Sequence, residues 1–106
     1  MTKTDIYIGL NDQETNEQQV ATEKYVSVLK NVCVSYRVSF SFNLIRGGYI
    51  HESGEYTQEN TLVLTLIDTE RAVIEEIARD LCTFFRQESV LITSSEVDTY
   101  SVRSGL

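Results

Sequence analysis

The sequence from residue 34 to residue 45 reads VSYRVSFSFNLI, and every second residue from Val34 to Leu44 is large and apolar. Alternation of this kind is typical of a strand with one buried face and one polar face. The polar positions between them are Arg37, Ser39, Ser41 and Asn43. We therefore predict a strand over 34–45 that packs against the core on one side and leaves the other sheet face open to solvent or to a partner.

The remaining elements follow from the same kind of pattern. Apolar residues alternate over 5–10 and 61–67, and a fourth strand begins at Ser89. Apolar residues at helical spacing predict one helix from Val20 to Val32 and another from Val73 to Phe85. The order β-α-β-β-α-β predicts a ferredoxin-like α+β sandwich, in which two helices cover one face of a four-stranded antiparallel sheet with strand order 4-1-3-2.

The connection between the second and third strands sets the register of the sheet. The tip at 52–55 (ESGE) predicts a two-residue turn. Continued inward without interruption, that register pairs Leu44 with Val63, which belong to opposite faces. One extra residue in the second strand pairs Leu44 with Leu62 instead, and the glycine pair at 47–48 is the natural place for such a bulge. We therefore predict a long hairpin whose outer part twists away from the sheet.

Length and charge restrict the classes of function. The 106 residues predict one domain over 1–106. The 16 acidic residues outnumber the 9 basic ones, and the net charge of −7 disfavours direct nucleic-acid binding. A basic protein surface is the macromolecular partner that such a chain would fit. The sequence holds neither a signal-peptide pattern nor an apolar run of the ~20 residues that a membrane helix needs, so we expect a cytoplasmic protein with no membrane partner.

Few residues are suited to catalysis or metal binding. His51 is the single histidine, and the sequence contains no phosphate-binding loop, nucleotide fingerprint or zinc-ligand pair. Cys33 and Cys82 lie in apolar segments, where reduced, packed thiols are expected, although a disulfide between them stays open. We therefore predict no cofactor, no metal and no catalytic residue, and enzyme activity is disfavoured without being excluded.

Two surfaces are candidates for binding. The central strands place apolar residues on the sheet face away from the helices, next to a polar edge strand, and this arrangement is typical of a protein interface. The edge strand is long and has little charge, which favours pairing with another chain. The predicted interaction residues are Tyr7, Arg37, Val63, Ile67 and Leu91 on the sheet, and Tyr49, His51 and Tyr56 on the protruding hairpin. Self-association through the sheet face or the second strand is the expected result.

The segment RGGYIHESGEYTQENTLVLTL, at 46–66, and the segment QESVL, at 87–91, resemble a small bacterial and phage family known as a domain of unknown function. This resemblance lies in the second half of the chain and implies a ferredoxin-like fold without an assigned activity. The overall layout is also similar to the trimeric regulators of the PII and CutA kind, which extend a hairpin as well. Fold analogy by itself does not establish function.

Three functions stay open at this point. The first is a non-catalytic, homo-oligomeric interaction module, such as a phage or mobile-element accessory protein that inhibits a host factor. The second is a regulator that binds a small ligand between subunits, as the PII and CutA layout implies. The third is a cofactor-free enzyme, in which Tyr25, Tyr36 or His51 would transfer protons.

Overall fold

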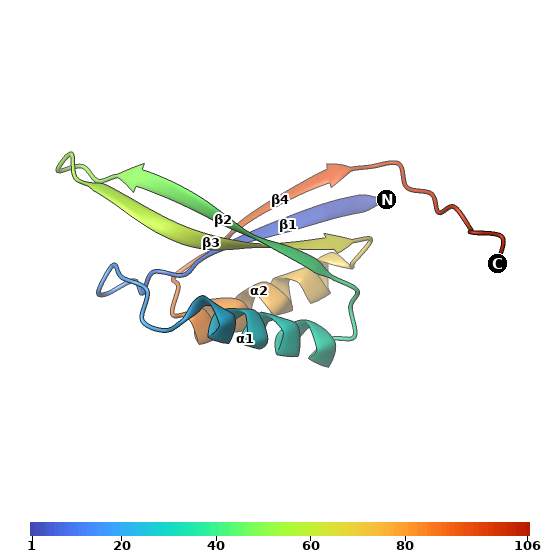
Figure 1. Ribbon diagram of the computed structural model, residues 1–106, viewed down its shortest axis with the longest axis horizontal. Coiled ribbons are helices and arrows are strands. Elements are labelled where there is room, and N and C mark those ends of the chain that lie inside the picture. Colours follow the sequence, from blue (N-terminus) through green and yellow to red (C-terminus); the bar gives the residue numbers. More distant parts are fainter.

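The computed structural model describes all 106 residues apart from the side chain of Tyr49. Its elements are β1 (Thr2–Gly9), α1 (Thr22–Ser35), β2 (Ser41–Ile50), β3 (Tyr56–Ile67), α2 (Arg71–Phe85) and β4 (Leu91–Glu96). The strands form one antiparallel sheet of order β2-β3-β1-β4, and both helices cover the same face (Figure 1). The predicted ferredoxin-like α+β sandwich is confirmed, with the predicted strand order.

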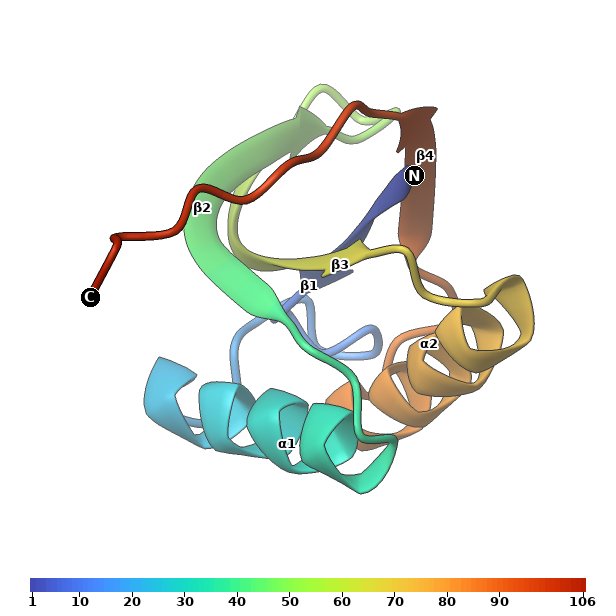
Figure 2. The same ribbon diagram turned by 90° about the vertical axis from the view of Figure 1, so that its right-hand side faces the viewer.

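The core lies between the two central strands and the helices. Ile6 pairs with Leu64 and Ile8 pairs with Leu62, and all four side chains are fully buried. Figure 2, which views the molecule along the sheet, shows α1 and α2 together beneath this face. Each buried side chain of this size contributes about 1.5–3 kcal/mol through loss of its hydrated apolar surface.

The prediction that a strand begins at Val34 is wrong, because α1 continues to Ser35 and β2 begins only at Ser41. The helix ends where Arg37 adopts the left-handed conformation, with φ of 56°. The Arg37 N–H donates to the Val34 carbonyl at 3.0 Å and the Val38 N–H donates to the Cys33 carbonyl at 3.3 Å, which is the Schellman pattern of a helix end. The extended connection that follows still packs alternate apolar side chains against the core, which explains the strand-like pattern; these are Tyr36, Val38 and Phe40.

The predicted bulge at Gly47–Gly48 is also wrong, because β2 pairs continuously with β3 through both glycines. The register nevertheless pairs Leu44 with Leu62, as expected. The extra residue that this register requires lies in the loop and not in β2. The His51 N–H donates to the Glu55 carbonyl and the Gly54 N–H donates to the His51 carbonyl, each at 2.9 Å. The loop therefore has three residues instead of two, and Gly54, with φ of +88°, supplies the left-handed position.

These two glycine sites give a testable contrast. Gly54→Ala is expected to destabilise the hairpin by about 1 kcal/mol, because a Cβ atom is unfavourable at a left-handed position. Gly47→Ala should be neutral, since a Cβ atom at residue 47 would meet nothing within 4 Å and φ there is ordinary. Hydrogen exchange of the hairpin amides measures the stability of the hairpin in each variant, and protection should be lower in Gly54→Ala than in Gly47→Ala. Equal protection in the two variants would show that the left-handed turn is misplaced.

The molecule is more extended than its length requires. Its radius of gyration is 15.5 Å, whereas a compact chain of this length has a value of about 13 Å. Two extensions account for this: the β2–β3 hairpin projects from one end of the sheet and residues 97–106 project from the other (Figure 1). We call these the arm and the tail. Among the described residues, no helix is long and apolar enough to cross a membrane.

Candidate functional site

The sheet face away from the helices carries a row of side chains across three strands. Val63 of β3 pairs with Tyr7 of β1, which pairs with Leu91 of β4. Side chains at directly paired positions lie next to each other on one face, so these three residues adjoin as the alternation predicted. Ile67 lies at the end of the same face, opposite Lys3. Sequence reasoning left out Ile45, an exposed apolar residue of β2 on this face, although the alternation places it there.

The other predicted interaction residues lie elsewhere. Arg37 is at the C-terminal end of α1, so its placement on the sheet face is corrected. The Tyr49 side chain is outside the described part of the structure. On the arm, Tyr56 is exposed, whereas the His51 Nε2 atom lies 2.7 Å from the Thr57 hydroxyl. The arm residues are therefore remote from the row centred on Tyr7.

A carboxylate lies on the same sheet face at Gly9. A Cβ atom built on Gly9 would lie 2.6 Å from the carboxylate atoms of Glu59, so that carboxylate occupies the space where a side chain would stand. One of its oxygens accepts a hydrogen bond from the Asn11 N–H at 3.0 Å. Sequence reasoning missed Glu59, although a glycine inside a strand often indicates that another group approaches the backbone closely. The face therefore holds a fixed negative charge two residues along β1 from Tyr7.

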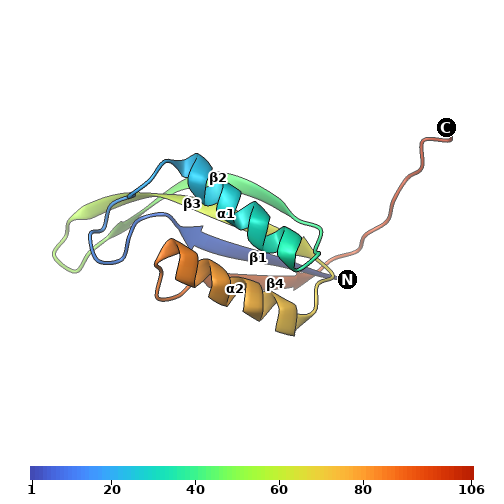
Figure 3. The ribbon, with the colours of Figure 1, turned by 90° about the horizontal axis from the view of Figure 1, so that it is seen from below.

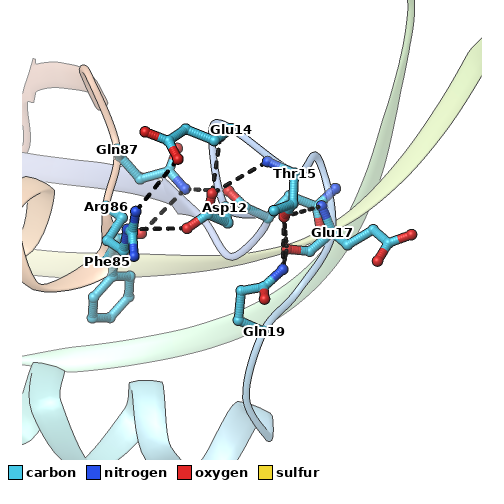
Figure 4. Close-up of polar contacts among 9 residues, drawn as sticks. Asp12, Glu14, Thr15, Glu17, Gln19, Phe85, Arg86 and Gln87 are labelled. Carbon is cyan, nitrogen blue, oxygen red and sulfur yellow. Dashed lines mark hydrogen bonds and ion pairs between the residues drawn. The ribbon is translucent and has the colours of Figure 1, made fainter.

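The loop between β1 and α1, residues 10–21, contains a second polar cluster (Figure 4). The Asp12 side chain is only 6% exposed and lies 3.1 Å from the Arg86 guanidinium. Its other oxygen accepts hydrogen bonds from the N–H groups of Glu14, at 2.9 Å, and Thr15, at 3.3 Å. The Gln87 amide donates to the Asn11 carbonyl at 2.5 Å, so the end of α2 is bound to this loop by two side chains.

The same loop supports the base of the arm. The Asn60 amide donates to the Gln18 side-chain oxygen at 3.0 Å, and the Asn11 amide donates to the Gln58 carbonyl at 3.4 Å. Farther out, the Asn16 amide donates to the Thr57 hydroxyl at 3.3 Å. The loop thus connects three structures that are far apart in sequence: the arm, the end of α2 and the end of β1.

An open cleft of about 410 Å³ adjoins this loop. Its volume lies within the range of small-molecule sites, roughly 300–1,000 Å³. Its lining contains both aromatic and polar side chains and includes Asp12, Thr15, Gln19, Tyr25, Phe84 and Arg86. Among the described residues, no group of three or more His, Cys, Asp or Glu side chains is arranged to hold a metal ion.

Two of the groups considered for proton transfer, Tyr36 and Tyr25, have structural roles in the fold. Tyr36 donates a hydrogen bond to the Asp80 carboxylate at 2.7 Å, and this bond, together with burial and nearby negative charge, raises its pKa to about 12. Tyr25 is a buried core residue whose ring packs edge-on against Phe85, with centroids 5.0 Å apart. Burial raises the pKa of the Cys33 thiol to about 11, and Cys33 and Cys82 are both free thiols. The catalytic role considered for the two tyrosines therefore has little support.

The Tyr36 contact predicts a specific pH dependence of stability. Above pH ~10 the unfolded chain loses the Tyr36 proton, while the folded chain retains it up to its raised pKa of about 12. The contribution of this residue should therefore be complete below pH ~10 and decline as the pH rises toward 12. Urea unfolding of the wild type and of Tyr36→Phe across this pH range measures this contribution as the difference between their free energies of unfolding. A difference that stays constant or increases with pH would contradict the contact.

A model of a family of proteins of unknown function, DUF3574, matches residues 3–100. The chain belongs to this family. The resemblance seen in the second half of the sequence is thus confirmed, and it extends over most of the first half as well. A direct comparison of the DUF3574 chain with curated proteins finds no match.

Solved structures share the fold of this DUF3574 chain. A phage SAM lyase in its apo state is 22% identical, with a TM-score of 0.72 over 99% of this chain and 90% of that chain. The phage SAM lyase in complex with S-methyl-5'-thioadenosine is 23% identical, with a TM-score of 0.70 over 97% and 89%. The divalent cation tolerance protein CutA from Archaeoglobus fulgidus is 13% identical, with a TM-score of 0.57 over 93% and 87%. At these identities the likeness shows the fold, and it confirms the predicted CutA-like layout.

Proposed function

We propose that this protein is a homo-oligomer that binds a small organic cation of the nucleoside class between two copies, on the sheet face next to Glu59. The observation that carries this proposal is the placement of the Glu59 carboxylate over Gly9. Gly9, at the end of β1, leaves room for this carboxylate, and a hydrogen bond from the Asn11 N–H fixes one of its oxygens on a face that also carries the apolar row of Val63, Tyr7 and Leu91. An anion that lies two residues along β1 from the Tyr7 ring is suited to a ligand that carries both a positive charge and a planar ring.

Self-association follows from the surfaces that one copy leaves exposed. Ile67 and Leu91 are exposed on the sheet face, and Ile50 and Tyr56 are exposed on the arm. Exposed apolar side chains of this kind are typical of interfaces. A second copy placed over the face would also remove water from around Glu59, which strengthens its attraction for a cation. The resemblance to trimeric regulators favours three copies.

The fold relatives suggest the ligand class. S-methyl-5'-thioadenosine, which is bound in the phage SAM lyase complex, is S-adenosylmethionine without its aminobutyrate part. S-adenosylmethionine carries a sulfonium and an ammonium group, so it fits a carboxylate-bearing site on a chain whose net charge is −7. S-adenosylmethionine is therefore the ligand to test first. The corresponding enzyme proposal is cleavage of its bond between the sulfonium sulfur and the aminobutyrate chain. The electron pair of that bond stays on sulfur to give S-methyl-5'-thioadenosine, and the carboxylate of the aminobutyrate part closes onto the freed carbon to give homoserine lactone.

Calorimetric titration with S-adenosylmethionine tests the site. The wild type should bind, and Glu59→Gln should weaken binding by about tenfold or more, because the variant keeps the shape of the side chain and loses its charge. Glu52→Gln, at the exposed tip of the arm, makes the same charge change away from the face and should bind like the wild type. Chromatography of the same mixtures shows whether S-methyl-5'-thioadenosine forms. Absence of binding to the wild type, or equal loss in both variants, would refute the proposed site.

A second candidate is the non-catalytic accessory protein that inhibits a basic host factor. The net charge of −7 and the protruding arm favour it, as does the phage origin of the SAM lyase with the same fold. Binding between an acidic protein and a basic partner weakens steeply as the salt concentration rises. Binding to candidate basic partners that is absent or insensitive to salt would reject this function.

A further inference from the structure

The tail has the sequence pattern of a strand but lies outside any sheet. Tyr100 and Val102 alternate with Ser101 and Arg103, which is the period-2 pattern of a strand with one buried face. The two apolar side chains are nevertheless 87% and 85% exposed. Among the described residues, the last backbone hydrogen bonds between the tail and the body join Val97 and Met1. Residues 100–103 therefore have the alternating pattern of a strand, but among the described residues of one copy no strand is bonded to them.

The outer edge of β2 is a strand edge without a partner. The strand order β2-β3-β1-β4 places β2 at one edge of the sheet. His51 and Glu55 share a backbone hydrogen bond at the start of the ladder, and bonded pairs alternate with non-bonded pairs in an antiparallel ladder. The odd-numbered residues of β2 therefore bond to β3, and the even-numbered ones, such as Leu44, direct their N–H and C=O groups outward.

This edge is also apolar on both faces. Leu44 is 50% exposed on the helix side, and its neighbour Ile45 is exposed on the other side. Edge strands of soluble proteins are usually protected by charges, proline or a covering segment. The stretch from Ser41 to Ile45 has none of these in one copy, which makes it suited to accept another strand.

The tail of the same copy is not placed to supply that strand. It leaves the sheet from β4, the edge opposite β2, with β3 and β1 between them. Figure 1 and Figure 3 both show it running outward beyond the end of the sheet. A neighbouring copy is therefore the partner that its direction fits.

We propose that residues 100–103 of one copy add as a strand to the outer edge of β2 in a second copy. Outward N–H and C=O groups of β2 would pair with the tail backbone, and Tyr100 and Val102 would cover one apolar face of the edge. Donor and acceptor are different surfaces of the same chain, so each copy would give a tail and receive one. Contacts of this head-to-tail kind form a closed ring when the rotation between copies closes, and a filament when it does not. This inference rests on the self-association in the proposed function, and it names the segment that joins the copies.

Substitutions on both sides of the contact test it. Val102→Lys places a charge on the face that should be covered, and Ser101→Lys places the same charge on the opposite face of the same segment. Leu44→Pro removes an outward N–H of β2 and keeps the hydrogen bonds to β3. Because it also removes the leucine side chain, Leu44→Thr is the control for that loss. Circular dichroism checks that each variant is folded.

Light scattering over a concentration series measures the effect. Val102→Lys and Leu44→Pro should each raise the dissociation constant Kd of the oligomer by about tenfold or more. The Kd of Ser101→Lys and of Leu44→Thr should differ from that of the wild type by about twofold at most. Hydrogen exchange should show protected amides at 100–103 in the oligomer and not in a monomeric variant. An oligomer unaffected by Val102→Lys, with unprotected tail amides, would overturn the inference and leave the proposed function standing. A wild type that is monomeric would refute both.

Discussion

Val63→Lys is expected to dissociate the oligomer and to raise the Kd of self-association by about 100-fold, which corresponds to roughly 2.7 kcal/mol. Val63 lies in the middle of the sheet face, on β3, and pairs directly with Tyr7. A lysine at this position would place an ammonium group next to Tyr7 and Leu91 at the centre of the interface, where loss of hydration is costly. Light scattering of the variant over a concentration series gives the Kd.

Asn31→Lys provides the matched control for this substitution. Asn31 is an exposed residue of α1, on the opposite side of the molecule from the sheet face, and it undergoes the same change from a neutral side chain to a cation. We expect this variant to associate like the wild type. If Val63→Lys also associates like the wild type, then the sheet face is open to solvent and does not form the interface.

Leu64→Ala is expected to have the largest effect on folding, with a loss of about 2–5 kcal/mol in the free energy of unfolding. Leu64 is fully buried between the sheet and the helices, and its truncation leaves a cavity. Leu44→Ala should cost about 1 kcal/mol or less, because Leu44 is 50% exposed and truncation removes little buried surface. Urea unfolding of both variants provides the comparison. Similar losses at the two positions would mean that the edge strand is buried in the folded chain.

The contrast between Leu64 and Leu44 shows how far alternation predicts burial. The pattern assigned both leucines to the buried face, and it assigned the face correctly, because Leu44 pairs with Leu62. It does not specify whether a helix covers that face at each point. Leu44 belongs to the edge strand and stays half exposed, whereas Leu64 is central.

The two errors in the fold have local physical causes. The strand predicted from Val34 fails because a helix end followed by an extended connection places apolar residues toward the core with the same spacing. The bulge predicted at Gly47–Gly48 is absent from the continuous pairing of β2 with β3, because a three-residue loop with Gly54 at positive φ provides the extra residue instead. The alternation of the two strands showed that the hairpin needs one extra residue for Leu44 to pair with Leu62. It did not show whether that residue lies in the loop or in the strand.

The candidate site was only partly predictable. Tyr7, Val63 and Leu91 adjoin on the sheet face as the register required. The position of the Glu59 carboxylate was not predictable in the same way. Its side chain reaches from β3 to Gly9 on the neighbouring strand β1, and the pattern of a single strand contains no information about such a contact. The contact between Asp12 and Arg86 joins the loop after β1 to the end of α2, and no local sequence pattern connects two positions so far apart in the chain.

The molar mass of the unmodified chain in solution shows whether the protein associates with itself. One copy has a mass of 12.1 kDa. We expect light scattering to give a whole multiple of this mass, with three copies favoured, and the oligomer to dissociate on dilution. A mass of 12.1 kDa at every accessible concentration, with or without S-adenosylmethionine, would contradict it.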